Sequence, residues 1–143
     1  MEKRYKYVIV AGCSRFGASI ASSLSLQGND VIVIDKDKKS FRKLLYNYSG
    51  FKMHGDATDV DILIEAGIKK ADIILAATDD DNTNIMISEI ASELFKIDKV
   101  VSRIYDTEKE IVYNDLDIKI IRPAKLSINE FERLTSENVM EVY

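Results

Sequence analysis

Short apolar runs alternate along this chain with segments in which apolar residues recur at the spacing of a helix. Six runs predict strands, at residues 7–11, 30–35, 51–54, 72–77, 100–104 and 118–121. The other segments predict helices, from the turn at 12–17 to Gly28 and then at 37–47, 59–66, 81–95, 107–115 and 125–136. Such alternation predicts parallel strands joined by right-handed crossovers. We therefore expect an α/β fold, with a doubly wound six-stranded parallel sheet and helices on both faces.

Two helical segments carry expectations of their own. The inner face of the segment 37–47 is expected to consist of Phe41, Leu44, Leu45 and Tyr48. After Pro123, the stretch Ser127–Tyr143 is predicted either to pack as a further helix or to project as an arm that exchanges with another subunit. We accordingly expect a main domain over 1–123 and a C-terminal helix or arm over 124–143, with a possible role in dimer formation.

The turn after the first strand has the features of a phosphate-binding loop that opens a helix. Gly12 lets the chain turn without steric cost, and Gly17 lets the helix approach the sheet closely. Ser14 stands where the usual pattern has its middle glycine, and its hydroxyl is able to donate to a phosphate oxygen. Amide groups and the dipole of the following helix would hold the phosphates. This arrangement is typical of a Rossmann-like nucleotide-binding fold.

Asp35 ends the second predicted strand, where a carboxylate accepts from both ribose hydroxyls of an adenosine and repels a 2′-phosphate. The alternative is a cap for the helix at 37–47, a role that Asp37 can fill equally well. We favour ribose binding because a glycine turn precedes Asp35. Lys36 and Asp37 are expected to line the entrance of the same ribose-binding site.

Arg15 lies in the glycine turn, where its guanidinium is expected to grip a polyphosphate in its own subunit or a neighbour's. The alternative is a solvated surface arginine. Asp56 follows the third strand and is placed to read an adenine edge, although the start of a capped helix explains it equally well. Ala77 and Thr78, at the end of the fourth strand, are expected to face the phosphates or the second ribose.

Four polar positions near these turns have structural explanations as well as functional ones. The acidic run Asp79–Asp81 is interpreted as a solvated helix N-terminus, in preference to a metal site. Arg103 lies on a strand, so its charge needs a ligand phosphate or a facing carboxylate. His54, the only histidine, is expected to be structural. Cys13 is interpreted as a small residue in a tight turn and not as a redox-active thiol.

Composition narrows the range of partners. The chain has 143 residues, a net charge of −4 and a sequence pI of about 5.1. One domain would use nearly all of this length, and the acidic balance argues against nucleic-acid binding or a basic membrane patch. No apolar run approaches the length of a bilayer span, so any membrane role is expected to come through a partner. A single cysteine excludes an intrachain disulfide and fits the cytosol.

The sequence offers no set of residues for catalysis. It has no spacing typical of a nucleophile and its base, no cluster of metal ligands and no Tyr-x-x-x-Lys pair after a strand. A stand-alone NAD-dependent oxidoreductase is therefore kept only as an alternative. A methyltransferase is a second one, but such folds usually end in an antiparallel hairpin, whereas the tail after Pro123 predicts a helix.

Taken together, these turns resemble the TrkA-N, or RCK (regulator of potassium conductance), family of regulatory subunits of bacterial potassium channels and transporters. The resemblance covers about residues 6–140. The matching positions are Arg15-Phe16-Gly17, Val33-Ile34-Asp35, Gly55-Asp56-Ala57-Thr58, Ala66-Gly67-Ile68, Ala71-Asp72, Ala77-Thr78-Asp79-Asp80 and Arg103-Ile104-Tyr105-Asp106.

This resemblance implies a non-enzymatic module that binds NAD(H) or an adenine nucleotide (ATP, ADP or AMP). It also implies homodimers that assemble into a ring on the cytoplasmic face of a membrane potassium-translocating subunit. The expected cofactor-binding residues are Gly12, Cys13, Ser14, Arg15, Phe16, Gly17, Asp35, Lys36, Gly55, Asp56, Ala57, Thr58, Ala77, Thr78 and Arg103. Ala124 stands where some relatives carry a glutamate that helps bind a divalent cation, so no metal residue is assigned. The sequence does not include the C-terminal regulatory domain that commonly follows in the family, so we expect either a one-domain subunit or a fragment of a longer gene product.

Overall fold

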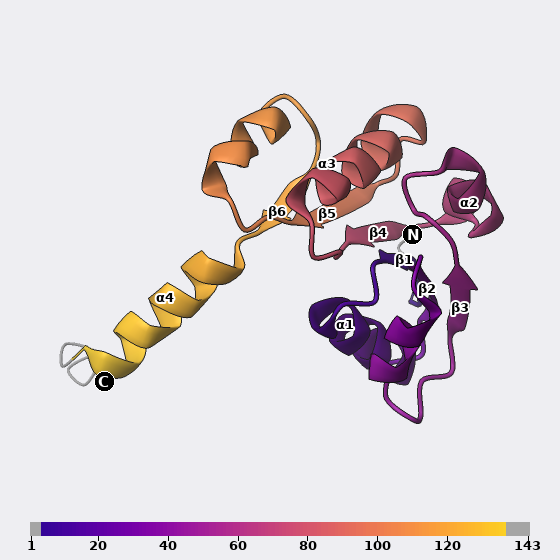
Figure 1. Ribbon diagram of the computed structural model, residues 1–143, viewed down its shortest axis with the longest axis horizontal. Coiled ribbons are helices and arrows are strands. Elements are labelled where there is room, and N and C mark those ends of the chain that lie inside the picture. The colour runs from indigo at the N-terminus through magenta and orange to yellow at the C-terminus, as the bar shows by residue number, and fades with distance from the viewer. Residues whose placement is uncertain (1–3, 137–143) are drawn as a thin grey trace.

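A parallel sheet of six strands runs through the structure in the order β3-β2-β1-β4-β5-β6 (Figure 1). The strands are β1 (Tyr7–Ala11), β2 (Asp30–Asp35), β3 (Phe51–His54), β4 (Ile73–Ala76), β5 (Lys99–Arg103) and β6 (Lys119–Ile121). The computed structural model describes residues 4–136. The strand order reverses between β1 and β4, which is the topology of the Rossmann-like folds. The predicted six-stranded α/β fold is confirmed.

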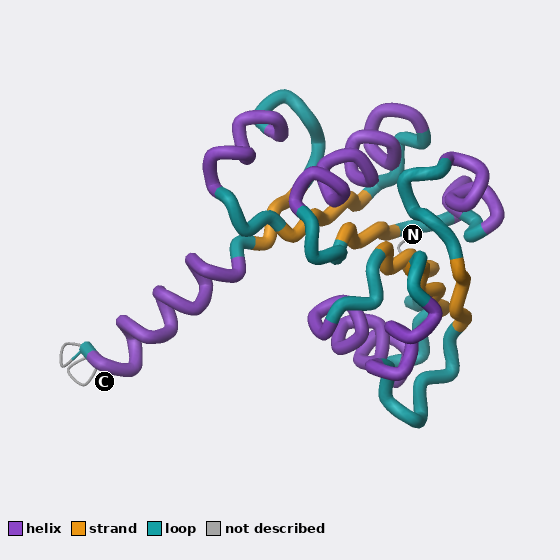
Figure 2. Tube along the Cα trace, viewed as in Figure 1, coloured by secondary structure: helices purple, strands orange, loops and turns teal. Residues whose placement is uncertain are grey.

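Helical segments separate the strands throughout, as Figure 2 shows. The α-helices are α1 (Arg15–Leu26), α2 (Val60–Glu65), α3 (Asp81–Glu89) and α4 (Pro123–Thr135). The 3₁₀ segments are η1 (Lys38–Lys43), η2 (Ile68–Lys70) and η4 (Thr107–Tyr113). The predicted helix 81–95 is α3 continued by one π-helical segment, η3 (Ile90–Leu94). The predicted helix 107–115 is the shorter η4.

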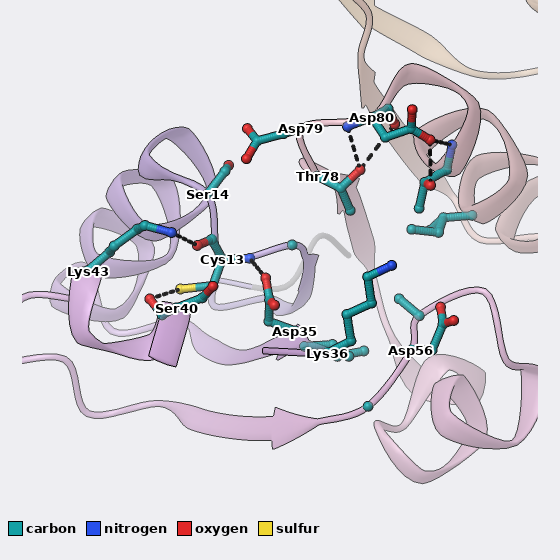
Figure 3. A pocket seen from close by; sticks show the side chains of 16 residues that line it. Cys13, Ser14, Asp35, Lys36, Ser40, Lys43, Asp56, Thr78, Asp79 and Asp80 are labelled. Atoms are coloured by element: carbon teal, nitrogen blue, oxygen red, sulfur yellow. Dashed lines mark hydrogen bonds between the residues drawn. The ribbon is translucent and has the colours of Figure 1, made fainter. Parts of the chain in front are cut away.

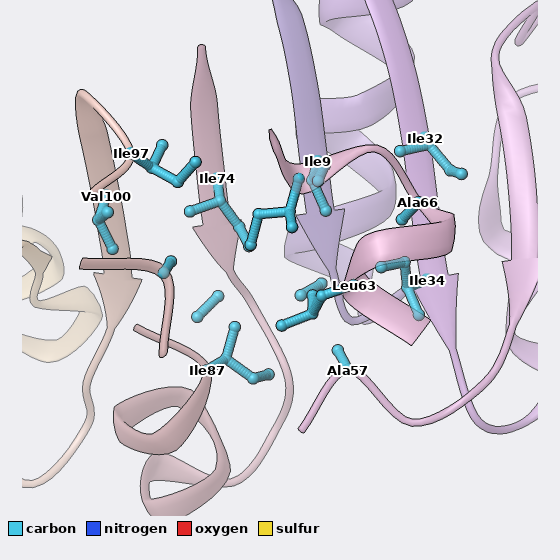
Figure 4. Close-up of a cluster of buried hydrophobic side chains, with 14 residues drawn as sticks. Ile9, Ile32, Ile34, Ala57, Leu63, Ala66, Ile74, Ile87, Ile97 and Val100 are labelled. Carbon is cyan, nitrogen blue, oxygen red and sulfur yellow. The ribbon is translucent and has the colours of Figure 1, made fainter. Parts of the chain in front are cut away.

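Alternate side chains of the central strands enter two separate cores, one on each face of the sheet. Ile9 and Ile74 belong to the core under α2 and α3, which Figure 4 shows together with Ile87 of α3. Val8 and Val10 belong to the other core, under α1 and η1. Each face of a parallel sheet needs such cover because both faces are apolar. Packing on both faces holds the sheet in place. The loops that follow the carboxyl ends of its strands are therefore attached to a rigid base.

The prediction of an α-helix over 37–47 is wrong. Only η1 is helical there, and Leu44 is already extended at φ −65° and ψ 145°. Tyr48 holds the rest of the segment in a loop, because its hydroxyl donates to the carbonyl oxygens of Val31 and Phe51. Leu44 is buried as expected, but Leu45 is 53% exposed. Tertiary hydrogen bonds therefore override the apolar spacing of this segment.

Helix α4 projects away from the sheet, and its C-terminal end is the part of the helix farthest from the other elements (Figure 1). None of its residues is buried, although Pro123 starts it in the usual first-turn position. Over the described part of Ser127–Tyr143, which ends at Ser136, this stretch is a helix that projects and does not pack on the sheet, whereas its exchange with another subunit stays a prediction. The remainder of that stretch, 137–143, lies outside the described residues.

Candidate functional site

A cavity of about 340 Å³ lies at the carboxyl ends of β1 to β4, the edge at which ligands bind in open parallel sheets (Figure 3). We call it the first cavity. From the predicted set it collects Gly12, Cys13, Ser14, Asp35, Lys36, Gly55, Asp56, Ala57 and Thr78. Its other lining residues are Ile34, Ser40, Lys43, Asp79, Asp80, Thr83 and Ile87. The reversal of strand order between β1 and β4 opens this crevice.

The turn between β1 and α1 requires its two glycines. Gly12 has φ +113°, and a Cβ at this position would lie 2.6 Å from the backbone nitrogen of Thr78. A Cβ on Gly17 would overlap the carbonyl oxygen of Gly12. The positive φ of Gly12 and the close packing at Gly17 agree with the roles predicted for these glycines, whereas the approach of Gly12 to Thr78 was not predicted. Both close approaches bring the N-terminus of α1 directly to the edge of the sheet.

Ser14 does not have the role that the sequence suggested for its hydroxyl. The hydroxyl donates to the carbonyl oxygen of Ala77 at 2.6 Å and accepts from the backbone N–H of Gly17 at 3.1 Å. It therefore caps α1 and ties the turn to the end of β4, which leaves its proton unavailable to a phosphate. The expectation that this hydroxyl donates to phosphate is wrong in this structure. The site keeps the helix N-terminus itself as a donor.

Asp35 is bonded directly to the glycine turn, and both line the first cavity. One carboxylate oxygen accepts from the N–H of Cys13 at 2.8 Å and the other from the N–H of Asp37 at 2.8 Å. Each oxygen keeps a further lone pair for a hydroxyl donor. Asp37 caps η1 through the N–H of Lys39, as expected of the alternative helix cap. Asp35 is thus fixed at the cavity with acceptor capacity to spare.

The Cys13 thiol is closed off from the cavity although the residue lines it. The side chain is fully buried, and its sulfur donates to the carbonyl oxygen of Ser40 at 3.3 Å. Burial, followed by the nearby Asp35 carboxylate, raises the pKa of the thiol to about 11. A protonated thiol is a poor nucleophile, so the small-residue interpretation fits the structure better than a redox role.

Asp56 is held on the opposite rim by its own turn. Its carboxylate accepts from the hydroxyl of Thr58 at 2.7 Å and from the N–H of Thr58 at 2.9 Å. These bonds hold the pKa of Asp56 below its usual range. Thr58 itself does not line either of the two cavities, and it acts here by orienting Asp56.

A second cavity, of about 430 Å³, adjoins the first on the side of α1 and β5. It is lined by Arg15, Phe16, Lys43, Asp79, Arg103 and Tyr105. Three predicted residues therefore lie here and not with the nucleoside-binding candidates. Lys43 and Asp79 line both cavities. Gly17 and Ala77 line neither, and they shape the turn and the end of β4 instead.

Arg103 is buried, as its strand position predicted, and it has the facing carboxylate that a buried charge needs. Its guanidinium donates to the carboxylate of Asp79 at 3.1 Å and to the carbonyl oxygen of Thr78 at 2.7 Å. The rings of Phe16 and Tyr105 lie 5.2 Å and 5.1 Å from the guanidinium carbon. Sequence reasoning anticipated the ion pair but not the two rings.

The acidic run divides into three roles, so the prediction of a solvated helix N-terminus is wrong for one member. Asp79 pairs with Arg103, and Asp80 caps α3. Asp81 is buried, with its oxygens accepting from the N–H groups of Tyr105 and Asp106 at 2.9 Å each. The first turn of α3 is thus bonded to the chain that leaves β5.

Lys43 and Ser40 were missed at the sequence level. Both lie on η1, and Lys43 donates through Nζ to the carbonyl oxygen of Cys13 at 3.2 Å. An α-helix over 37–47 gave no reason to direct either residue at the glycine turn. His54, by contrast, is exposed at the end of β3 and bonds the carbonyl oxygen of Lys36 through its ring, consistent with a structural role.

Residues 4–136 contain neither a cluster of metal ligands nor a membrane-spanning helix. No three side chains among His, Cys, Asp and Glu there are grouped so as to hold a metal ion. In the same range, no helix has both the length and the apolar character needed to cross a membrane.

Comparison with known proteins decides the family. The sequence profile of the TrkA-N domain matches residues 8–123, which is most of the chain. The chain belongs to the TrkA-N family. A relative from Streptomyces coelicolor, a Trk system potassium uptake protein TrkA, is 35% identical over 127 residues. That match covers 89% of this chain but only 57% of the relative, so the chain spans little more than half of that protein.

Solved structures with the same fold include GsuK in two liganded forms. The GsuK protein bound to ADP has a TM-score of 0.75 and 25% identity, covering 90% of this chain and 33% of that one. The GsuK channel bound to NAD has a TM-score of 0.77 and 24% identity, covering 94% of this chain and 24% of that one. Such likeness establishes the shared Rossmann-like fold.

Proposed function

We propose that this TrkA-N domain is a nucleotide-binding regulatory module of a potassium transport system. Its ligand in this proposal is an adenine nucleotide (ATP, ADP or AMP) or NAD(H), held in the first cavity. The observation that carries the proposal is the position of Asp35, whose carboxylate is hydrogen-bonded to the glycine turn at Cys13 and lines the first cavity with acceptor capacity left. The names of the relatives support the link to potassium uptake.

The binding mode follows from the placement of donors and acceptors. Asp35 accepts from the ribose hydroxyls, while the N-terminal amides of α1 meet the first phosphate. Asp56 and Ala57, on the opposite rim, lie where the base would rest. We propose that the domain acts by binding and not by catalysis.

Regulation in this proposal is a shift between two arrangements of an assembly. A nucleotide biases such an equilibrium only through its difference in affinity for the two states. We assign residues 1–123 to nucleotide binding and 124–143 to contact with a second copy. The assembly would be a homodimer, grouped into a ring on the cytoplasmic side of a membrane potassium-translocating subunit.

The test is a titration by calorimetry of the purified protein with AMP, ADP, ATP, NAD⁺, NADH and S-adenosylmethionine. At least one adenine nucleotide or NAD(H) is expected to bind. Asp35→Ala is expected to abolish that binding, because both ribose hydroxyls lose their acceptor. Asp37→Ala is the matched control, since this carboxylate is exposed on the same segment and does not line the first cavity.

Thermal melting without ligand shows whether each variant is folded. Unchanged affinity in a folded Asp35→Ala protein would remove the ribose assignment. Binding of none of the six compounds by the wild-type protein would overturn the proposed function.

A further inference from the structure

The layers on the two faces of the sheet carry opposite charge. Residues 13–54, which contain α1 and η1, have seven arginines and lysines against three aspartates. Residues 55–98, which contain α2 and α3, have eleven carboxylates against three lysines. The sheet therefore separates a basic layer from an acidic one, and the net charge of −4 conceals the difference. A charge distribution of this kind orients a protein toward a charged partner.

Segment η1 distributes its side chains according to 3₁₀ geometry, in which residues three apart lie on the same side. Phe41, on the first side, packs against the apolar core beneath η1. Ser40 and Lys43, on the second side, line the first cavity. Lys39 and Arg42 share the third side, and both are exposed. The side of η1 that remains for a partner outside the domain is therefore basic.

The loop that follows η1 adds exposed apolar side chains to these cations. Leu45 and Tyr46 are 53% and 100% exposed. Figure 1 shows the loop between η1 and β3 extending past α1 to the lowest point of the view. Within residues 4–136, no carboxylate forms an ion pair with Lys38, Lys39 or Arg42. We call these five exposed residues the η1 surface.

We propose that the η1 surface binds the anionic headgroups of a lipid membrane. Its three cations contact headgroup phosphates, while Leu45 and Tyr46 enter the boundary between the headgroups and the acyl chains. An acidic macromolecule would attract the same cations. The fully exposed Tyr46 on a projecting loop favours lipid, because an apolar tip leaves water there without a pocket shaped to receive it. Helix α1, which packs beside η1, has no acidic residue to repel the headgroups.

The acidic overall balance does not exclude such a surface, contrary to the expectation from the sequence, because this balance is an average over two unlike layers. Contact with headgroups needs no membrane-spanning helix. The residues of the η1 surface line neither cavity, so lipid binding is independent of nucleotide binding. In an assembly at a membrane, the η1 surface would add a lipid contact to the contact with the protein partner.

The test is co-sedimentation of the purified protein with lipid vesicles. One set consists of phosphatidylcholine, and the other of phosphatidylcholine with an equal part of phosphatidylglycerol. Binding is expected to the mixed vesicles alone and should weaken as the salt concentration rises. A triple variant, Lys38→Gln, Lys39→Gln and Arg42→Gln, is expected to weaken this binding at least about tenfold.

Matched controls separate the η1 surface from general effects of charge and hydrophobicity. A control triple variant, Lys69→Gln, Lys99→Gln and Lys125→Gln, removes the same charge from exposed positions elsewhere, and it should weaken binding by less than about threefold. Tyr46→Ser is expected to weaken binding about fivefold through the lost apolar contact. Ile111→Ser is its control, because Ile111 is 74% exposed on η4, and this change should leave vesicle binding unaltered.

Two outcomes would overturn lipid binding by the η1 surface as a whole. They are the absence of binding to the mixed vesicles and equal weakening by the two triple variants. Binding that needs the cations but is unaffected by Tyr46→Ser would overturn the assignment to lipid in favour of an acidic macromolecule. Thermal melting shows that each variant is folded. A protein that binds nucleotide but no vesicles keeps the proposed function, and one that binds vesicles but no nucleotide keeps the η1 surface.

Discussion

The central strand β1 and the helix α4 represent two extremes of burial in one chain. Val8, Ile9 and Val10 of β1 are at most 1% exposed, whereas no residue of α4 is buried. Strand β1 is a continuous apolar run and α4 carries apolar residues at helical spacing, so both sequences predict an apolar surface that another element covers. The difference shows that an apolar pattern identifies a surface that is stabilised by burial. The pattern does not say whether the same chain or another copy buries it.

Helix α4 exposes several large apolar side chains along its length. These are Leu126, Ile128, Phe131 and Leu134, between 56% and 67% exposed. The sheet, by contrast, has an apolar core on each of its two faces. The fold should therefore depend on the sheet and its turns, while α4 should matter for association. Three predictions test this division between the sheet and α4, in order of decreasing effect on stability.

Gly12→Ala should have the largest effect, because it acts at the end of β1 where the backbone of the β4 edge is closest. The added Cβ would lie within 2.8 Å of three backbone atoms of Ala77 and Thr78, in a left-handed conformation that alanine resists. We expect a loss of several kcal/mol in the free energy of unfolding, or failure to fold. Urea unfolding followed by circular dichroism measures it, and a loss below about 1 kcal/mol would contradict the observed turn.

The second prediction compares truncation of one apolar side chain in each region. Ile87, on α3, is fully buried in the sheet core, and Leu134, on α4, is 67% exposed. Ile87→Ala should cost about 2–5 kcal/mol through lost transfer energy and a cavity. Leu134→Ala should stay within about 0.5 kcal/mol in the isolated chain.

Both variants are compared by urea unfolding at protein concentrations low enough to keep the chain monomeric. A cost for Leu134→Ala that approaches the cost for Ile87→Ala would show that α4 packs against the sheet in solution. A cost that appears only at high concentration would show instead that α4 is covered by another copy.

The sequence predicted the fold better than it predicted the details of the site. The six parallel strands, the helices on both faces and the glycine turn follow from apolar runs and from Gly12 and Gly17, because these features depend on local sterics and on burial. Lys43 could not be found in the same way. Its place at the cavity depends on η1 being a short 3₁₀ segment, which is favoured by the hydrogen bonds of the Tyr48 hydroxyl to distant Val31 and to nearby Phe51.

The hydroxyl of Ser14 illustrates the same limit. From the sequence it was a free donor beside a phosphate site, and nothing local indicated that the carbonyl oxygen of Ala77, 63 residues away, would accept its proton. The fate of a polar group in a tight turn depends on which distant backbone groups lack partners. Arg103 was easier to anticipate, because a charge on a buried strand must find compensation somewhere.

The smallest predicted effect is a pH dependence that should arise at the sheet and not in α4. The folded-state pKa of Cys13, about 11, lies above its ordinary value of 9.0, so the unfolded chain releases the thiol proton first as pH rises. Stability from this group is complete below pH 9 and is lost as pH rises toward 11, by up to about 2 kcal/mol. Cys13→Ser removes the titrating group, so the variant should lose less stability than the wild type over this range.

The titrating group in α4 that we compare with Cys13 is Glu130. Its hydrogen bonds to Arg133 lower the pKa of its carboxyl group. A lowered carboxyl pKa contributes stability above its unfolded value and loses it as pH falls. Because both side chains are more than half exposed and lie on the projecting helix, Glu130→Gln should leave the acid branch of the stability curve unchanged. Unfolding curves from pH 3 to 11 for both variants test the pair together. Two results would contradict the assignment of stability to the sheet and its turns. One is a loss of stability at alkaline pH that is as large in Cys13→Ser as in the wild type. The other is a change in the stability of the protein at acid pH caused by Glu130→Gln.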